Sequence, residues 1–229
     1  MTKSFIFSPK GSIVIPVLGG TNYPVRRVYC VGRNYEAHAL EMGNNPVKDP
    51  PFFFMKPVES IVSEGGEIAY PPETKEYHHE VELVVALKSG GISIRVADAL
   101  NHVFGYAVGL DMTRRDLQTE AKKMGRPWDF AKGADQSAPI SRVCSVEECG
   151  HLYNEKISLR VNGNLKQEAK LSDMIWGVAE IISYLSKYQT LQPGDLIFTG
   201  TPAGVGPVDK GDQLVAAISG VTKLTVQIN

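Results

Sequence analysis

The sequence predicts a predominantly β fold of the α+β class, with a few short helices. Short runs rich in β-branched and aromatic residues recur between glycine and proline turns, as in residues 25–31, 80–87 and 103–110. Asn162-Gly163 joins two further runs in the pattern of a β-hairpin. Helical patterns are confined to four stretches, residues 35–42, 96–103, 113–123 and 172–188.

Length and composition indicate a soluble globular chain. It has 229 residues, of which 43% are apolar and 21% charged, and no linker, repeat or low-complexity segment interrupts it. We therefore expect one domain over residues 1–229, with short strands in residues 1–24. The net charge of -1 favours neither a nucleic-acid nor a membrane-surface partner. No run approaches the ~18 apolar residues of a membrane span.

The cysteines point to a reducing compartment. Cys30, Cys144 and Cys149 are odd in number and lack the C-x-x-C spacing of many zinc and redox sites. They predict reduced buried thiols in a cytoplasmic protein rather than a disulfide framework or a zinc site.

The first candidate catalytic pair lies in the predicted helix 35–42, which Gly43-Asn44-Asn45-Pro46 would end. His38 and Glu41 are three residues apart and therefore share one helix face. A carboxylate beside an imidazole orients the ring and raises its basicity, as a general base requires. The same spacing also fits an ordinary pair on a solvated helix face.

Two predicted strands follow, one with only apolar side chains and one that carries two carboxylates. Residues 52–55, Phe-Phe-Phe-Met, predict a fully buried strand, with a ligand-stacking platform as the alternative. In the strand 80–87, Glu80 and Glu82 point to the same face, where like charges repel. A hard divalent cation would offset that repulsion, and a solvated edge is the alternative.

Asp111 stands at the end of the predicted buried strand 103–110. It fits either the N-cap of the helix 113–123 or a third oxygen ligand beside Glu80 and Glu82. Three carboxylates form a hard, all-oxygen donor set, which favours Mg²⁺, Mn²⁺ or Ca²⁺ over zinc.

Further polar candidates lie after this strand. Arg115 and Gln118 share a face of the predicted helix, and arginine can grip a substrate carboxylate through two hydrogen bonds, although a solvated face explains them as well. Lys132 lies between small and aromatic residues, so we expect it to be partly buried beside a carboxylate or a ligand. The glycine-rich loop 199–207 predicts backbone N–H groups and a Thr201 hydroxyl that face a ligand.

Together, these motifs resemble the fumarylacetoacetate hydrolase family. The shared motifs are Gly32-Arg33-Asn34-Tyr35 with His38 and Glu41, Phe54-x-Lys56-Pro57, His79-Glu80-Val81-Glu82-Leu83, Asp111-x-Thr113-x-Arg115-Asp116, Lys132, and Thr199-Gly200-Thr201-Pro202-x-Gly204-Val205-Gly206. The resemblance covers the chain from about residue 25 to its end. It is strongest to the short, single-domain acylpyruvases and fumarylpyruvate hydrolases.

The resemblance implies a mixed β-sandwich roll, a homodimer and one Mg²⁺ or Mn²⁺ per subunit, with Ca²⁺ as a substitute. It also implies a role for each site residue: Glu80, Glu82 and Asp111 as metal ligands, His38 and Glu41 as a water-activating pair on a lid helix at 35–42, Lys132 as the group that stabilises negative charge, and Arg115, Gln118, Gly200 and Thr201 as the holders of the substrate's carboxylate end.

The expected reaction is hydrolysis of a 2,4-diketo acid to pyruvate and a carboxylic acid. Fumarylpyruvate is favoured over acetylpyruvate because Arg33 could pair with its second carboxylate. Two alternatives use the same metal and also form an enolate: decarboxylation of oxaloacetate and isomerisation of a hydroxy-dienedioate. A third alternative is a non-catalytic, metal-stabilised binding protein.

Overall fold

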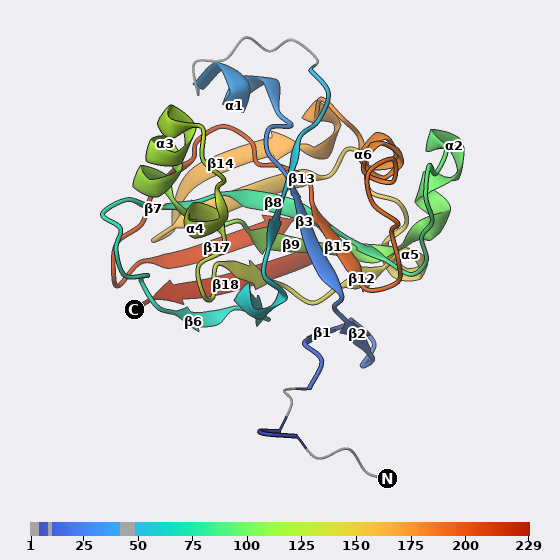
Figure 1. Cartoon of the computed structure of the whole chain (residues 1–229), viewed down its shortest axis with the longest axis horizontal. Helices are drawn as coiled ribbons and strands as arrows, with labels where there is room; N and C mark the ends of the chain where they lie inside the picture. Colours follow the sequence, from blue (N-terminus) through green and yellow to red (C-terminus); the bar gives the residue numbers. More distant parts are fainter. Residues whose placement is uncertain (1–4, 9–10, 42–48) are drawn as a thin grey trace.

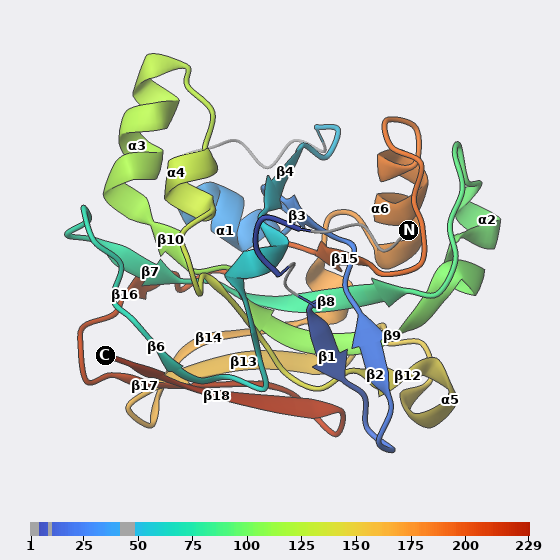
Figure 2. The same cartoon turned by 60° about the horizontal axis from the view of Figure 1, so that its bottom comes forward.

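The computed structural model describes residues 5–8, 11–41 and 49–229, without the side chains of residues 39–41. Most described strands belong to two sheets that pack face to face (Figures 1 and 2). The larger sheet has the order β4-β3-β15-β8-β9-β11-β5, with β12 beside β9. Its strands are β3 (Arg27–Val31), β4 (Phe53–Lys56), β5 (Ile61–Ser63), β8 (Val81–Leu87), β9 (Val103–Leu110), β11 (Ala138–Ile140), β12 (Cys144–Ser145) and β15 (Asp195–Phe198).

The second sheet has the order β14-β13-β17-β18-β6, and two small sheets, β10-β7-β16 and β1-β2, complete the described strands. These strands are β1 (Val14–Pro16), β2 (Asn22–Pro24), β6 (Gly66–Ile68), β7 (Tyr77–His79), β10 (Thr113–Arg114), β13 (Lys156–Val161), β14 (Asn164–Lys170), β16 (Gly206–Pro207), β17 (Gln213–Ile218) and β18 (Thr222–Ile228). Parallel pairs such as β15–β3 and β18–β6 occur among antiparallel ones. The predicted mixed, predominantly β fold is confirmed.

The helices are short. They are α1 (Glu36–Glu41), α2 (Val96–Ala99), α3 (Arg115–Met124), α4 (Asp129–Lys132), α5 (Val146–Cys149) and α6 (Val178–Leu185), with 3₁₀ turns η1 (Val58–Ser60), η2 (Leu100–His102) and η3 (Leu171–Asp173). Figures 1 and 2 show α1, α3 and α4 gathered at one end of β8, and α2 and α6 at the other. Within the described ranges, no helix is long and apolar enough to cross a lipid bilayer.

Three sequence predictions about elements need correction. The strand at 52–55 is not fully buried, because β4 lies at the edge of its sheet and Met55 is 46% exposed. The helix expected at 113–123 begins only at Arg115, since Thr113 and Arg114 pair with β7 as a short strand. The helix expected at 172–188 is reduced to Val178–Leu185, preceded by the separate turn η3.

Strand β8 explains how carboxylates enter a buried region. All its residues are buried, yet the strand still alternates between two apolar clusters. Val81, Leu83 and Val85 pack with the second sheet, while Val84 and Ala86 belong to the smaller cluster on the opposite face. Because side chains alternate along a strand, Glu82 points to the side of Val84, away from the larger core.

The register of the two central strands brings Glu80 and Asp111 together. Strands β8 and β9 are antiparallel, and Val81 at the start of β8 pairs with Leu110 at the end of β9. The residues just outside this pair are Glu80 and Asp111, and the Asp111 N–H donates a hydrogen bond to the Glu80 carbonyl oxygen over 2.9 Å. The backbone pairing therefore fixes two distant carboxyl groups side by side at the end of the sheet that α1, α3 and α4 cover.

Candidate active site

Three buried carboxyl groups form the centre of the site. One carboxylate oxygen from each of Glu80, Glu82 and Asp111 lies within 4.8 Å of the other two. All three residues are at most 5% exposed. The structure thus brings together the three acidic residues that the sequence singled out: Glu82 lies in β8, Glu80 directly precedes β8, and Asp111 directly follows β9.

Lys132, in α4, bridges two of these carboxylates. Its Nζ lies 2.8 Å from Glu80 Oε2, 2.6 Å from Asp111 Oδ2 and 2.7 Å from the Thr113 hydroxyl oxygen. Burial lowers the pKa of the Lys132 ammonium, but the charges of Asp111 and Glu80 outweigh burial and raise it to about 12. The sequence predicted partial burial of Lys132 beside a carboxylate or a ligand; the residue is 2% exposed, lies beside two carboxylates, and stays charged at neutral pH.

Two more cations flank the carboxylates. Arg115 Nη2 lies 2.5 Å from Glu80 Oε1, and its Nη1 donates to Gln118 Oε1, also over 2.5 Å. Lys56 Nζ lies 2.8 Å from Asp111 Oδ1. Sequence reasoning gave Lys56 no role of its own, although its place at the end of an apolar strand is a signal for a buried cation. Three carboxylates therefore face three cations, and the cluster is close to neutral.

The two glutamates differ sharply in their electrostatic surroundings. Burial raises the pKa of Glu80, but Lys132 and Arg115 outweigh burial and hold it below its ordinary value. Burial, together with the charges of Asp111 and Glu80, raises the pKa of Glu82 well above its ordinary value. The Glu82 carboxylate accepts a hydrogen bond from the Gly200 N–H over 2.7 Å, and no described cation forms an ion pair with it.

The contact with Glu82 requires a glycine at position 200. Its φ is +95°, a conformation that L side chains rarely adopt, and an added Cβ would lie 2.7 Å from Asn34 Cβ. The glycine therefore allows the loop to approach Glu82 closely enough for the N–H to donate. The sequence predicted that Gly200 holds substrate, and the structure adds this contact with Glu82.

Thr201 has partners within the fold. Its hydroxyl donates to the Val81 carbonyl oxygen over 2.9 Å and accepts from Gln167 Nε2 over 2.8 Å. Gln167 Oε1 in turn accepts from the Val81 N–H and lies 3.0 Å from His79 Nδ1. This network, which sequence reasoning missed, ties the loop 199–207 to the start of β8. A substrate contact of Thr201 stays a prediction.

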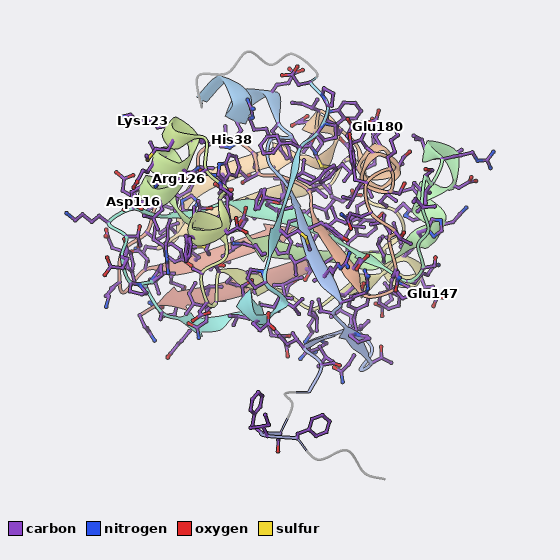
Figure 3. All side chains as sticks on the ribbon, in the orientation of Figure 1. His38, Asp116, Lys123, Arg126, Glu147 and Glu180 are labelled. Carbon is purple, nitrogen blue, oxygen red and sulfur yellow. The ribbon has the colours of Figure 1, made fainter. Side chains whose placement is uncertain are left out.

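A cavity of about 390 Å³ opens beside the carboxylates. Its wall includes several residues predicted for the site: Arg33, His38, Glu80, Arg115, Gln118 and Lys132. His38 is only 5% exposed, and its side chain lies between α1 and α3 (Figure 3). The structure therefore places the candidate base on the same cavity as Glu80, one of the three carboxylates. The Glu41 side chain lies outside the described residues.

The donor set fits a hard divalent cation. Asp111 Oδ1 is buried and accepts no hydrogen bond among the described residues. Lys56 Nζ is close to it, but it donates instead to Met112 O, Lys132 O and Ser137 Oγ. The ion pair with Lys56 offsets part of the cost of burying this oxygen, and a divalent cation shared with Glu80 and Glu82 would supply the further partner that it lacks. Glu80, Glu82 and Asp111 are thus the residues that could hold a metal.

Comparison with known proteins identifies the enzyme family to which this fold belongs. Residues 27–229 match the model of the fumarylacetoacetate (FAA) hydrolase C-terminal domain. The chain belongs to the fumarylacetoacetate hydrolase family, as the sequence motifs predicted.

Named relatives in this family carry different activities. A fumarylpyruvate hydrolase from Pseudomonas aeruginosa, solved with Mn²⁺ and pyruvate, is 48% identical with a TM-score of 0.95, over 98% of this chain and 99% of that one. Mitochondrial oxaloacetate tautomerase FAHD1 from Mus musculus is 43% identical over 89% of this chain and 91% of its own. A mitochondrial oxaloacetate decarboxylase from Dictyostelium discoideum is 42% identical over 86% and 90%.

Proposed function

We propose that this protein is a divalent-metal-dependent hydrolase that cleaves a carbon–carbon bond of a 2,4-diketo acid, with fumarylpyruvate as the favoured substrate. The observation that carries the proposal is the buried imidazole of His38 on the wall of the cavity that contains Glu80. The similarity to a fumarylpyruvate hydrolase over nearly the whole chain supports the same reaction.

The metal would be Mg²⁺ or Mn²⁺, held by Glu80, Glu82 and Asp111. When bound, it supplies Lewis-acid polarisation of the substrate's oxygens and neutralises negative charge. Arg115 and Gln118, already aligned by their mutual hydrogen bond, would hold the carboxylate of the 2-keto acid end. The near-neutral cluster becomes cationic when a divalent ion is added, which matches an anionic substrate.

His38 would act as the general base. It takes a proton from a water molecule in the cavity, and the oxygen of that water bonds to the C4 carbonyl carbon. Lys132 keeps its charge in this buried setting and would stabilise the negative oxygen that forms. Glu41, three residues from His38, would orient the imidazole.

The bond between C3 and C4 then breaks. Its electron pair remains with the three-carbon fragment, and C3 takes up a proton to give pyruvate. The other fragment leaves as a carboxylic acid whose new oxygen comes from water. A buried base near the metal site makes this reaction possible, because the attacking water must lose its proton as it attacks.

A second candidate function rests on the curated relatives named for oxaloacetate tautomerisation and decarboxylation. Tautomerisation moves a proton between C3 and the 2-keto oxygen. Decarboxylation breaks the C3–C4 bond, releases C4 as CO₂ and adds a proton to C3. Neither reaction needs an attacking water molecule. In that case His38 would transfer a proton at C3, and Lys132 would stabilise the negative charge on the 2-keto oxygen.

The two candidates differ in the substrate that is turned over best. We expect kcat/KM to be highest for fumarylpyruvate, and roughly 10–100-fold lower for acetylpyruvate because it lacks one charge-assisted contact. The measurement compares fumarylpyruvate, maleylpyruvate, acetylpyruvate and oxaloacetate, each with Mg²⁺ and with Mn²⁺. A preference for acetylpyruvate would exclude fumarylpyruvate as the favoured substrate, and a preference for oxaloacetate would support the second candidate instead.

A further inference from the structure

We propose that Lys122, together with Arg33, forms an anion subsite at the mouth of the cavity that binds the distal carboxylate of a long 2-keto dicarboxylate. The inference rests on the proposed function in one respect, namely that the keto acid end of the ligand lies at Arg115. Sequence reasoning assigned a second carboxylate to Arg33 alone, and Lys122 had no role. Both residues line the cavity.

Each of the two cations lies over one ring of a pair of aromatic rings that contact each other. Lys122 Nζ lies 5.1 Å from the centre of the Trp128 ring, and Arg33 Cζ lies 5.5 Å from the centre of the Phe52 ring. The two rings contact each other edge to face, with centres 5.4 Å apart. Cation–π contacts of this kind restrict long side chains without neutralising their charge. Both cations therefore remain able to bind an anion.

Close packing fixes the Phe52 ring itself. Gly32 contacts it so tightly that an added Cβ would lie 1.9 Å from a ring carbon. On the other side, the Trp128 ring also contacts Phe54, at 5.8 Å between ring centres. The aromatic platform of Phe52 and Trp128 is thus held from two directions, which pre-organises the cations and lowers the cost of binding.

The charges around Lys122 are mostly positive. No carboxylate lies within ion-pair distance of Lys122 in the part of the chain that the structure describes. Burial lowers the pKa of Lys122, and the charges of Arg115, Lys132 and Arg33 lower it further, against an opposing effect of Glu80. A bound carboxylate would relieve this repulsion.

Helix α3 sets the distance between the two ends of the ligand. Arg115, Gln118 and Lys122 follow at spacings of three and four residues, so they lie along one helix face and line the cavity together. Seven residues of helix correspond to a rise of roughly 10 Å between Arg115 and Lys122.

That distance selects for ligand length. The terminal carbons of an extended seven-carbon dicarboxylate are about 7.5 Å apart, which leaves room for one ion-pair contact at each end. The terminal carbons of a four-carbon dicarboxylate are only about 4 Å apart, too close for it to reach both Arg115 and Lys122. The subsite therefore fits a 2-keto acid with a second carboxylate at C7, and it leaves oxaloacetate without a contact at Lys122.

Two matched probes test the subsite without relying on catalysis. 2-Oxoheptanedioate and 2-oxoheptanoate differ only in the distal carboxylate, and neither has the 4-carbonyl group that hydrolysis requires. Calorimetric titration of the Mn²⁺-loaded protein gives the ratio of the two dissociation constants. We expect the wild type to prefer the dicarboxylate by about 10-fold or more, and Lys122→Gln to lose most of that preference.

Two further variants separate charge from structure. Lys122→Arg should keep the preference, because it keeps the cation. Lys123→Gln removes the same charge from the next residue of α3 (Figure 3). Both lysines are exposed, but Lys123 does not line the cavity, so this variant should also keep the preference. If Lys122→Gln lowers the unfolding temperature but leaves the ratio unchanged, Lys122 only supports Trp128 and the subsite is refuted.

The result is independent of the hydrolase assignment. A Lys122-dependent preference in a protein that fails to hydrolyse fumarylpyruvate would keep the subsite and exclude the proposed reaction. If Lys122→Gln hydrolyses fumarylpyruvate at an undiminished rate and its binding ratio is unchanged, the proposed reaction is kept and the subsite is excluded.

Discussion

Replacing His38 by alanine is expected to lower the rate of diketo acid hydrolysis by ~10²–10⁴-fold, the usual cost of losing a general base. The residue is buried in the short helix α1 and lines the cavity that Glu80 and Lys132 also line. Because His38 is not one of the three carboxylates proposed to hold the metal, the Mn²⁺ affinity of His38→Ala should be close to that of the wild type. The measurements are kcat with fumarylpyruvate at saturating Mn²⁺, and Mn²⁺ binding by calorimetry.

A matched control is His151→Ala, since His151 is exposed and bonds to Tyr106 away from the cavity. That variant should hydrolyse fumarylpyruvate at close to the wild-type rate. Oxaloacetate decarboxylation should decline less than hydrolysis in His38→Ala, because decarboxylation needs no attacking water. Near-normal hydrolysis by His38→Ala would show that the base lies elsewhere.

Replacing Glu82 by glutamine is expected to have opposite effects on the metal-loaded and metal-free protein. Removing a proposed metal ligand should weaken Mn²⁺ binding by at least about 100-fold, since outer partners alone typically contribute 10–100-fold. Without metal, the same change should stabilise the fold, because it removes a buried carboxylate that stands next to Asp111 and Glu80 without a cation of its own.

The direction of the pH dependence follows from the raised pKa of Glu82. A carboxyl group that ionises less readily in the folded state stabilises the fold fully below its ordinary pKa of about 4.3. That contribution is lost as the pH rises through the folded-state pKa. The metal-free wild type should therefore unfold at a lower temperature than Glu82→Gln at neutral pH, and the gap should narrow as the pH falls toward 4. Mn²⁺ affinity of the wild type should rise with pH.

The stability prediction is checked by thermal unfolding in the presence of a chelator, from pH 4 to 8. The metal-affinity prediction is checked by Mn²⁺ titrations at the same pH values. The control is Glu147→Gln, an exposed glutamate on α5, far from His38 in Figure 3, which should move neither quantity. If Glu82→Gln binds Mn²⁺ as tightly as the wild type, Glu82 is not a ligand.

Local sequence patterns singled out the residues of the acidic centre, although a solvated edge and a helix N-cap explained them equally well. The period of two along a strand placed Glu80 and Glu82 together, and a carboxylate at the end of a buried strand marked Asp111. What the pattern could not supply was the register between β8 and β9, which is a tertiary property. The family resemblance, rather than any spacing, was needed to connect His38 with these residues across the chain.

Other features could not be predicted because they depend on packing. The edge position of β4 follows from the strand order of the sheet, and the Gly200 contact with Glu82 follows from a loop that returns from over a hundred residues away. Lys122 did carry a signal, since it stands seven residues after Arg115 on the same helix face. The metal identity, the homodimer, the single-domain organisation and the cytoplasmic location stay predictions.

The central claim is that the cavity activates water against a diketo acid. It is tested most directly by mass spectrometry of the products formed from fumarylpyruvate in ¹⁸O-labelled water, with chelator-treated protein before and after Mn²⁺ is restored. We predict fumarate with one labelled carboxylate oxygen, together with pyruvate, only when Mn²⁺ is present. Equal product formation without metal, or consumption of the substrate without fumarate, would contradict the account.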